Sequence, residues 1–382
     1  MNILNLGELT PERFLREYWQ KKPLLIRQAF ADFQPVIEPD ELAGLACEEE
    51  VEARLVVQSP DSDDWSLRQG PFDEQDFASL PASHWTLLVQ AVDHWVPDAA
   101  ELLAQFDFIP NWRRDDLMIS YAVDGGGVGP HYDNYDVFLI QAAGQRRWEV
   151  GGLYDESSPR RDDAPVMILP EWTAEESWVL EPGDMLYVPP QVGHNGFAVG
   201  DGCMTYSVGF RAPSHAEIMR HFTDFVGERL RGEDRYRDPD LDVQANPAEI
   251  GDDAIGRLRA ALHRYIDDDA LLGEWFGRYM TEAKYPELDQ APEEKVTTDE
   301  LRDFLAGGGS LSRNEGARLA FRRQGEGWQL FADGQCYEGS TQQGPLFASI
   351  CGGGGLDLGD DTDFAIELLT QLVNQGVFYS DD

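Results

Sequence analysis

The first hundred residues combine helical patterns with polar loops. In TPERFLREYW, a cap, a proline and an acid precede apolar residues at helical spacing, which predicts a helix. The LLI that follows KKP predicts a short strand, and residues 38–105 mix helical patterns with acidic loops. We therefore expect residues 1–105 to form an N-terminal helical part.

From about Leu117 the pattern changes to short β-rich runs. The runs are LMISYAV, HYDNYDVFLIQ, RRWEVG, VMIL, SWVLEPGDMLYVPP, HNGFAV and CMTYSVGF, divided by Gly, Pro and Asp turns. No long helical pattern separates them. Such spacing is typical of a β-sandwich or β-barrel, which we place at about residues 106–212.

Helical periodicity returns after Pro213. The apolar residues of HAEIMRHFTDFVGERL fall on one helical face, and further helices are expected at 254–267 and 269–281. The Pro- and acid-rich stretch 282–294 is typical of a linker. Beyond it, TTDELRDFLAGG and DTDFAIELLTQLVNQG predict helices, and ARLAFRRQGEGWQLFADGQCYEG predicts two or three small strands. This α+β mixture suits a small winged-helix-like module.

The strongest chemical signal is the pair His131-x-Asp133 inside GGGVGPHYDNYDVFLIQ. In a strand, residues i and i+2 point to the same face, so one strand end presents an imidazole and a carboxylate side by side. His194, after EPGDMLYVPPQVG, is the candidate third ligand. Two histidines and one carboxylate leave open positions on a metal and are diagnostic of non-haem Fe(II) oxygenases.

A second His-x-acid pair provides a comparison within the same chain. His215-x-Glu217 has the same spacing and could recruit His221 or His263. Its surroundings are helical, and on a helix residues i and i+2 point about 200° apart and cannot converge on one metal. We therefore reject this pair. The glycine run at 125–129 does not fit a phosphate-binding motif either, and we interpret it as a rim loop beside the site.

Two polar residues in the predicted barrel suggest an anionic cosubstrate. If RRWEV is a strand, Arg146, Trp148 and Val150 share one face. An arginine among apolar neighbours is costly unless an anion meets it, and a dicarboxylate would supply that anion bidentately. Ser120 in LMISYAV precedes the metal loop, and its hydroxyl could share the same carboxylate. The alternatives are an outward-facing arginine and a serine bonded to the backbone.

Charge and cysteine content narrow the class of protein. The 382 residues carry 71 acids against 30 Lys and Arg, for a net charge of −41, which argues against binding nucleic acid or an anionic membrane. The four cysteines are far apart and suggest neither a zinc site nor a disulfide framework. The first residues lack a signal-peptide pattern, so we expect a cytoplasmic protein without a membrane segment.

The chain resembles the JmjC-type ribosomal oxygenases, specifically those that hydroxylate an arginine of the large-subunit ribosomal protein L-sixteen. The segments FLREYWQKKPLLIRQAF, LMISYAVDGGGVGPHYDNYDVFLIQAAGQRRWEVG, EPGDMLYVPPQVGHNG and YSVGFRAP carry the resemblance. It implies an α+β multidomain protein with a cupin-like double-stranded β-helix. The expected parts are a JmjC oxygenase domain at 1–212, a helical dimerisation region at 213–281 and a winged-helix-like domain at 282–382.

The same resemblance implies the site and the reaction. His131, Asp133 and His194 fall on the family's iron ligands, and Arg146 and Ser120 fall on its 2-oxoglutarate contacts. Fe(II), 2-oxoglutarate and O2 would support hydroxylation of an arginine in a basic ribosomal protein, by an enzyme expected to be a homodimer. Within the class, a ribosomal-protein histidine hydroxylase or a lysine demethylase is the alternative. A non-catalytic metal-binding cupin that acts as an interaction protein, and a DNA-reading winged helix, are the alternatives from other classes.

Overall fold

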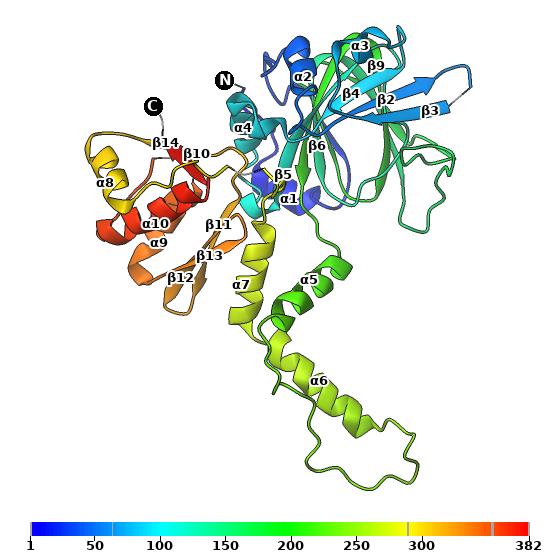
Figure 1. The fold of residues 1–382 in the computed structure, drawn as a ribbon. Helices are drawn as coiled ribbons and strands as arrows, with labels where there is room; N and C mark the ends of the chain where they lie inside the picture. Colours follow the sequence, from blue (N-terminus) through cyan, green and yellow to red (C-terminus); the bar gives the residue numbers. More distant parts are fainter. Residues whose placement is uncertain (1, 63, 289, 353–354, 381–382) are drawn as a thin grey trace. The chain divides into compact units, whose positions relative to one another are not determined.

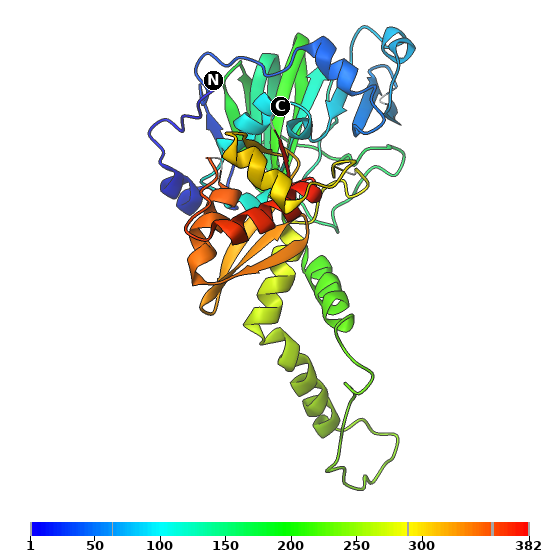
Figure 2. The ribbon, with the colours of Figure 1, turned by 60° about the vertical axis from the view of Figure 1, so that its left-hand side comes forward.

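The chain divides into two compact units, residues 1–212 and 213–382. The computed structural model describes residues 2–62, 64–288, 290–352 and 355–380 (Figures 1 and 2). Each unit has its own hydrophobic core. Among the described residues, no helix combines the length and the apolar character needed to cross a membrane.

The first unit is built on a nine-stranded antiparallel sheet (Figure 1). Its strands follow the order β1-β8-β6-β9-β5-β4-β2-β3, and β7 pairs with β6. The strands are β1 (Leu24–Ile26), β2 (Ala53–Ser59), β3 (Asp64–Gln69), β4 (Trp85–Val89), β5 (Arg114–Ala122), β6 (Val137–Leu153), β7 (Glu176–Leu180), β8 (Met185–Val188) and β9 (Val192–Phe210).

The two long strands give this sheet the form of a barrel. The first half of β6 pairs with β8 and with the end of β9, and its second half pairs with β7 and with the start of β9. Register shifts between Gln141 and Gln145 mark the bend, because bulges bend a strand and increase its twist. Both strands therefore belong to two layers, which is the arrangement of the expected double-stranded β-helix.

The two faces of the barrel wall differ in what covers them. Outside, the wall packs on aromatic side chains from the short N-terminal helices, with Phe14 and Phe106 against Phe138. Inside, an apolar cluster that includes Trp148 and Val150 joins the two layers. The helical segments of this unit are α1 (Pro11–Glu17), α2 (Pro39–Leu45), α3 (Glu74–Ala78), α4 (Pro97–Ala104), η1 (Val92–His94) and η2 (Asn111–Arg113).

The predicted EPGD turn fastens the N-terminal segment to the barrel. Gly183 has φ +90°, and a Cβ there would lie 2.2 Å from the Phe30 carbonyl oxygen, so only glycine fits. The buried carboxylate of Asp184 accepts hydrogen bonds from the Gln28 amide at 2.9 Å and from Arg27 at 2.6 Å. These contacts hold β1 beside β8.

Three expectations about local structure need correction. Residues 1–105 are not mainly helical, because they also supply strands β1 to β4. The run VMIL at 166–169 is not a strand but part of the loop between β6 and β7. In HYDNYDVFLIQ the strand begins only at Val137, and His131 forms an isolated bridge ahead of it. Short apolar runs do not by themselves distinguish strands from buried loops.

The second unit combines helices with two small sheets. Strands β11, β12 and β13 form one antiparallel sheet, and β10 pairs with β14. Its elements are α5 (His215–Gly227), α6 (Asp252–Ile266), α7 (Asp269–Met280), α8 (Thr298–Ala306), β10 (Leu311–Arg313), β11 (Leu319–Gln324), β12 (Gly327–Ala332), β13 (Gln335–Gly339), η3 (Thr341–Gln343), α9 (Gly344–Cys351), α10 (Thr362–Asn374) and β14 (Phe378–Ser380).

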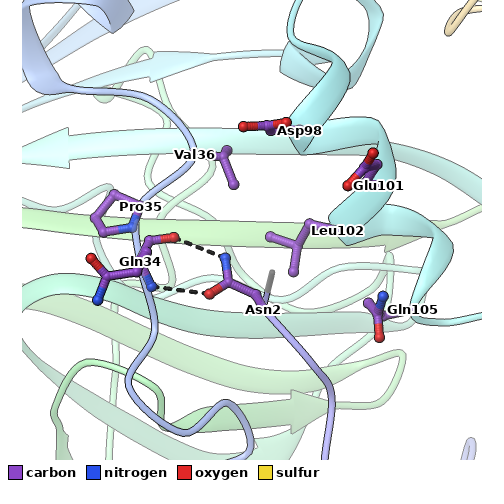
Figure 3. Close-up of a pocket in the computed structure, with 8 residues that line it drawn as sticks. All are labelled: Asn2, Gln34, Pro35, Val36, Asp98, Glu101, Leu102 and Gln105. Carbon is purple, nitrogen blue, oxygen red and sulfur yellow. Dashed lines mark hydrogen bonds between the residues drawn. The ribbon is translucent and has the colours of Figure 1, made fainter.

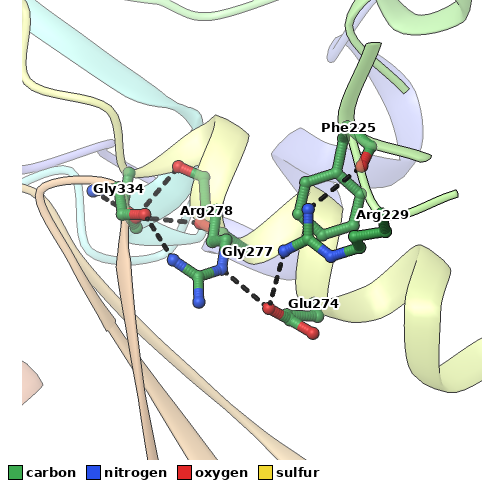
Figure 4. A network of polar contacts seen from close by, with 7 residues as sticks. Phe225, Arg229, Glu274, Gly277, Arg278 and Gly334 are labelled. Carbon is green, nitrogen blue, oxygen red and sulfur yellow. Dashed lines mark hydrogen bonds and ion pairs between the residues drawn. The ribbon is translucent and has the colours of Figure 1, made fainter. Parts of the chain in front are cut away.

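A polar network connects α7 to its neighbours in this unit (Figure 4). The Arg278 guanidinium donates to the Gly334 carbonyl at 3.2 Å and to Glu274 at 2.9 Å. Arg229, just beyond α5, donates to the same Glu274 carboxylate at 3.4 Å and stacks on Phe225. The β12–β13 turn, α7 and the end of α5 are thereby held together.

Candidate metal centre

His131, Asp133 and His194 come together at one end of the barrel. One ligand atom from each lies within 4.8 Å of the others, and no second such group of His, Cys or acidic residues is found among the described residues. The Asp133 Oδ2 atom is 3.5 Å from His194 Nε2 and 4.0 Å from His131 Nε2. The convergence that the sequence pattern predicts is therefore present, although Asp133 lies beyond the bridge and not within a strand.

Backbone pairing sets the distance between the two imidazoles. The amides and carbonyls of His131 and His194 exchange hydrogen bonds of 2.9 and 2.8 Å, so the residues face each other across an antiparallel bridge. Their ring centroids are 4.3 Å apart. Paired backbones place two side chains on one face with little freedom, which suits a metal site.

Both imidazoles are oriented by backbone carbonyls, and burial keeps His194 neutral. His131 Nδ1 lies 2.9 Å from the Gly129 carbonyl, and His194 Nδ1 lies 3.1 Å from the Val192 carbonyl. Each Nδ1–H can donate there, which leaves Nε2 with a free lone pair. Burial lowers the pKa of His194 to about 4, so this imidazole is neutral at pH 7 and available as a ligand.

Arg146 points into the barrel interior. It is 4% exposed, and Trp148 and Val150 on the same face are also buried, as the alternation of β6 predicts. Its Nη1 donates to the Gly196 carbonyl at 3.4 Å, whereas Nε and Nη2 have no partner among the described residues. These two nitrogens form one edge of the guanidinium fork, the edge that binds a carboxylate bidentately.

Ser120 is buried in the same interior, on β5. Its hydroxyl donates to the Thr205 carbonyl at 3.3 Å. Thr205 in turn donates to Gln141 at 3.1 Å, so a polar band crosses the inner wall of the barrel. Ser120 is thus a backbone-bonded serine as the structure stands, and the long bond leaves its hydroxyl free to rotate toward a ligand.

The rejected pair His215-x-Glu217 is part of the first turn of α5. The Glu217 carboxylate accepts from the Ser214 amide at 2.7 Å and completes a capping box there. This role in helix capping explains the pair without a metal.

A cavity of about 540 Å³ is lined by residues that neighbour His131 and His194 in the sequence, but none of the five predicted site residues lines it. It is framed by the β2–β3 hairpin, the glycine loop after β5 and the start of β9, which continues from His194. Sequence reasoning identified the glycine loop and the β-rich runs that contain Arg147 and residues 195–198, but it missed strands β2 and β3, which supply Gln58 and Trp65. The lining residues are Gln58, Trp65, His84, Asp124, Gly125, Gly127, Gly129, Pro130, Arg147, Asn195, Gly196, Phe197, Ala198 and Val199.

A smaller hollow of about 250 Å³ lies away from the metal centre (Figure 3). Asn2 crosses it and exchanges hydrogen bonds of 2.8 and 3.0 Å with the Gln34 backbone. Asp98 and Glu101 of α4 face the same space. None of the predicted site residues lines it, so the candidate chemistry belongs to the barrel.

Two protein-family models match separate parts of the chain. A model of the JmjC domain matches residues 101–218, a range that contains all five predicted site residues. A model of the ROXA-like winged helix matches residues 264–379, which begins within α6 and includes α7. The expected cupin-like core and winged-helix-like module are thereby confirmed.

Known proteins match almost the whole chain. The ribosomal protein uL16 3-hydroxylase of Escherichia coli (strain K12) is 39% identical over 375 residues, which is 96% of each protein. The probable ribosomal oxygenase of Haemophilus influenzae is 35% identical over 82% of this chain and 79% of its own. The X-ray structure of E. coli YcfD has a TM-score of 0.90, and YcfD in complex with cobalt and 2-oxoglutarate has 0.88, each with 36% identity and full coverage of both chains.

Proposed function

The chain belongs to the JmjC-domain ribosomal oxygenases, and from this membership we propose that it hydroxylates an arginine side chain of the large-subunit ribosomal protein uL16. The observation that carries this proposal is the convergence of two imidazoles and one carboxylate beside a buried arginine that lacks an anionic partner among the described residues. Fe(II) and 2-oxoglutarate are the cofactor and cosubstrate of such an enzyme.

His131, Asp133 and His194 would hold the iron. The donor set fits, because two imidazole nitrogens and one carboxylate oxygen are the facial triad of non-haem Fe(II) oxygenases. When bound, iron with 2-oxoglutarate and O2 supplies the oxidation that inserts one oxygen atom into a C–H bond and releases succinate and CO2. The burial of His194 keeps water away from one side of the site, while His131 and Asp133 are each about one-fifth exposed.

Arg146 and Ser120 would bind the far carboxylate of 2-oxoglutarate. The unpartnered Nε and Nη2 atoms of Arg146 supply two parallel donors, and a buried charge of this kind is costly until an anion meets it. The Ser120 hydroxyl supplies a further donor after a rotation away from Thr205. Both residues orient the cosubstrate from inside the barrel.

The 540 Å³ cavity is a proposed contact surface for the basic substrate, outside the barrel interior that holds the metal ligands. Asp124 contributes a carboxylate to its lining, which suits a cationic guanidinium. The net charge of −41 adds a long-range attraction for a basic ribosomal protein and opposes binding to nucleic acid. A ribosomal partner supports a cytoplasmic location for the proposed enzyme.

We also propose that the protein is a homodimer that associates through α6. Ile255, Leu258, Leu262 and Ile266 are all exposed and lie at helical spacing on one face of this helix. Light scattering should give the mass of two chains for the wild type and of one chain for Leu258→Glu/Leu262→Glu. Ala260→Glu, on another face, should stay dimeric. A monomeric wild type at micromolar concentration contradicts this part of the proposal.

The activity is tested with Fe(II), 2-oxoglutarate and a peptide of uL16. We expect succinate release that requires Fe(II), and one arginine of the peptide heavier by the mass of one oxygen atom. His131→Ala and Asp133→Ala should abolish both. Hydroxylation on histidine, or loss of methyl groups from lysine, would replace the proposal by one of the alternatives within the class. Turnover that survives both substitutions would refute the enzyme assignment.

A further inference from the structure

The barrel interior contains a third buried donor without an acceptor. Besides Nε and Nη2 of Arg146, the indole Nε1–H of Trp148 has no exposed surface and no hydrogen-bond partner among the described residues. Buried donors in folded proteins are nearly always satisfied, and an unsatisfied one costs free energy. Donors left open close together are therefore evidence for a ligand with several acceptor atoms.

Trp148 lies between the proposed anion anchor and the metal ligands. It follows Arg146 by two positions on β6 and shares its inward face, with the guanidinium carbon 5.6 Å from the indole ring. Its ring is also 5.9 Å from that of His194. A molecule that extends from the metal centre to Arg146 must therefore pass alongside Trp148.

Glycine at position 196 fixes how the indole lies. A Cβ at Gly196 would be 2.5 to 2.7 Å from Cζ3, Cη2 and Cε3 of Trp148, and such similar distances to three adjacent ring atoms mean that the face of the benzene ring lies over this backbone. The Nε1–H lies in the plane of this ring, and no carbonyl among the described residues accepts from it.

We propose that the Trp148 Nε1–H donates to the far carboxylate of 2-oxoglutarate and makes Trp148 a positioning residue that selects a dicarboxylate over a shorter keto acid. This inference rests on the proposed function. A carboxylate offers about four acceptor sites, of which the Arg146 fork takes two. Ser120 already has the Thr205 carbonyl as an acceptor, whereas Trp148 has none among the described residues, so Trp148 gains most from the ligand.

The test measures ligand binding rather than turnover. Zn(II) replaces iron because it takes the same nitrogen and oxygen ligands and is redox-inert. Calorimetry then gives the dissociation constants of 2-oxoglutarate and of pyruvate, which has the keto acid end but no far carboxylate. Trp148→Phe keeps an aromatic ring beside Arg146 and removes only the donor and part of the volume.

The substitution should raise the dissociation constant of 2-oxoglutarate about 10-fold, as expected for loss of a hydrogen bond to a charged group, and should leave pyruvate unchanged. Trp178→Phe is the matched control. Trp178 faces Trp148 across the β6–β7 pairing, and its loss should change neither constant.

The other outcomes distinguish a failure of the role proposed for Trp148 from a failure of the proposed function. Unchanged 2-oxoglutarate binding, or equal weakening of both ligands, would overturn the role of Trp148 alone. A wild type that binds Zn(II) but not 2-oxoglutarate would overturn the proposed function and this inference with it. If Trp148→Phe fails to fold, a crystal structure of the wild type with Zn(II) and 2-oxoglutarate decides, because Nε1 must then lie about 3 Å from a far carboxylate oxygen.

Discussion

Arg146, the proposed anchor of the cosubstrate, should lower the stability of the ligand-free protein. Its guanidinium is buried in an apolar interior, makes one hydrogen bond of 3.4 Å and has no ion-pair partner among the described residues. Removing a charge from water costs several kcal/mol unless other contacts compensate for it. The ligand-free protein therefore carries an unfavourable free energy that the proposed binding of a dicarboxylate at Arg146 would remove.

Arg146→Met should change stability and binding in opposite directions. Methionine fills much of the same volume without a charge, so we expect the ligand-free variant to be more stable by about 1–3 kcal/mol. Binding of 2-oxoglutarate should fall at least about 100-fold, because the bidentate contact is lost. Thermal unfolding and calorimetry measure the two effects.

Arg147→Met provides the matched control. Arg147 is the next residue on β6, lies on the opposite face of the strand and lines the 540 Å³ cavity. Its stability and its affinity for 2-oxoglutarate should stay close to the wild-type values. An Arg146→Met protein that is less stable and still binds 2-oxoglutarate would show that this arginine has a purely structural role.

Asp333 should make the stability of the second unit depend on pH in a predictable direction. Burial raises the pKa of its carboxyl to about 6 from an ordinary 3.8, although the Arg318 amide donates to it. The folded state therefore binds a proton more tightly than the unfolded state. Stability from this group is full below pH 3.8 and is lost as the pH rises toward 6.

Asp333→Asn should accordingly stabilise the protein at pH 7.5 by about 1–2 kcal/mol, a value reduced for the partial exposure of the group. Asparagine keeps the acceptor for the Arg318 amide and tolerates the φ of +41° at this position. Urea unfolding at several pH values measures the difference, which should fade near pH 4. A difference that does not change with pH would contradict the assignment.

At the scale of elements, α7 packs on the β11–β13 sheet through two glycines. A Cβ at Gly277 would lie 2.3 Å from the Phe331 ring, and one at Gly273 would collide with the Arg322 side chain. Glycine weakens a helix by about 0.5–1 kcal/mol relative to alanine. At these two positions the closer packing against the sheet offsets that loss. The helix cannot approach the sheet as closely with larger residues.

Gly277→Ala should therefore destabilise the second unit by about 1–3 kcal/mol, because Phe331 must move within a packed core. Gly256→Ala in α6 is the control with the opposite expected sign. No atom lies within 4 Å of a Cβ there, and alanine should stabilise the helix. Denaturant unfolding of both variants tests the contact, and equal effects of the two substitutions would contradict it.

The elements also show where sequence reasoning succeeded. The capped helix at Thr10, the inward face of Arg146 and Trp148, and the Pro182-Gly183 turn follow from local rules and are present. The convergence of His131 and Asp133 was predicted from their spacing of two residues and from their position in the barrel sequence. These features depend on residues close together in the chain.

What the sequence did not reveal depends on distant contacts. Strands β2 to β4 were missed because they are short and lie among acidic loops, and pairing in the sheet stabilises them. The open donor of Trp148 was also invisible, since it depends on a glycine 48 positions away whose backbone holds the ring. Such features emerge only from tertiary packing.

For the whole molecule, the large negative charge should govern encounter with the substrate. The chain carries −41 and its proposed substrate is basic, so attraction at long range should accelerate association. We expect kcat/KM for full-length uL16 to fall several-fold between about 0.05 and 0.3 M salt. The KM for 2-oxoglutarate, which is set inside the barrel, should change little. Salt-independent turnover of uL16 would show that the acidity has another origin.

The central claim is that His131, Asp133 and His194 hold a metal whose cosubstrate reaches Arg146. The most direct measurement is an anaerobic crystal structure with Mn(II) in place of Fe(II) and with 2-oxoglutarate. The metal should bind Nε2 of both histidines and a carboxylate oxygen of Asp133, and the far carboxylate of 2-oxoglutarate should lie on Nε and Nη2 of Arg146. A metal bound elsewhere, or a cosubstrate that leaves Arg146 without a partner, would contradict the account.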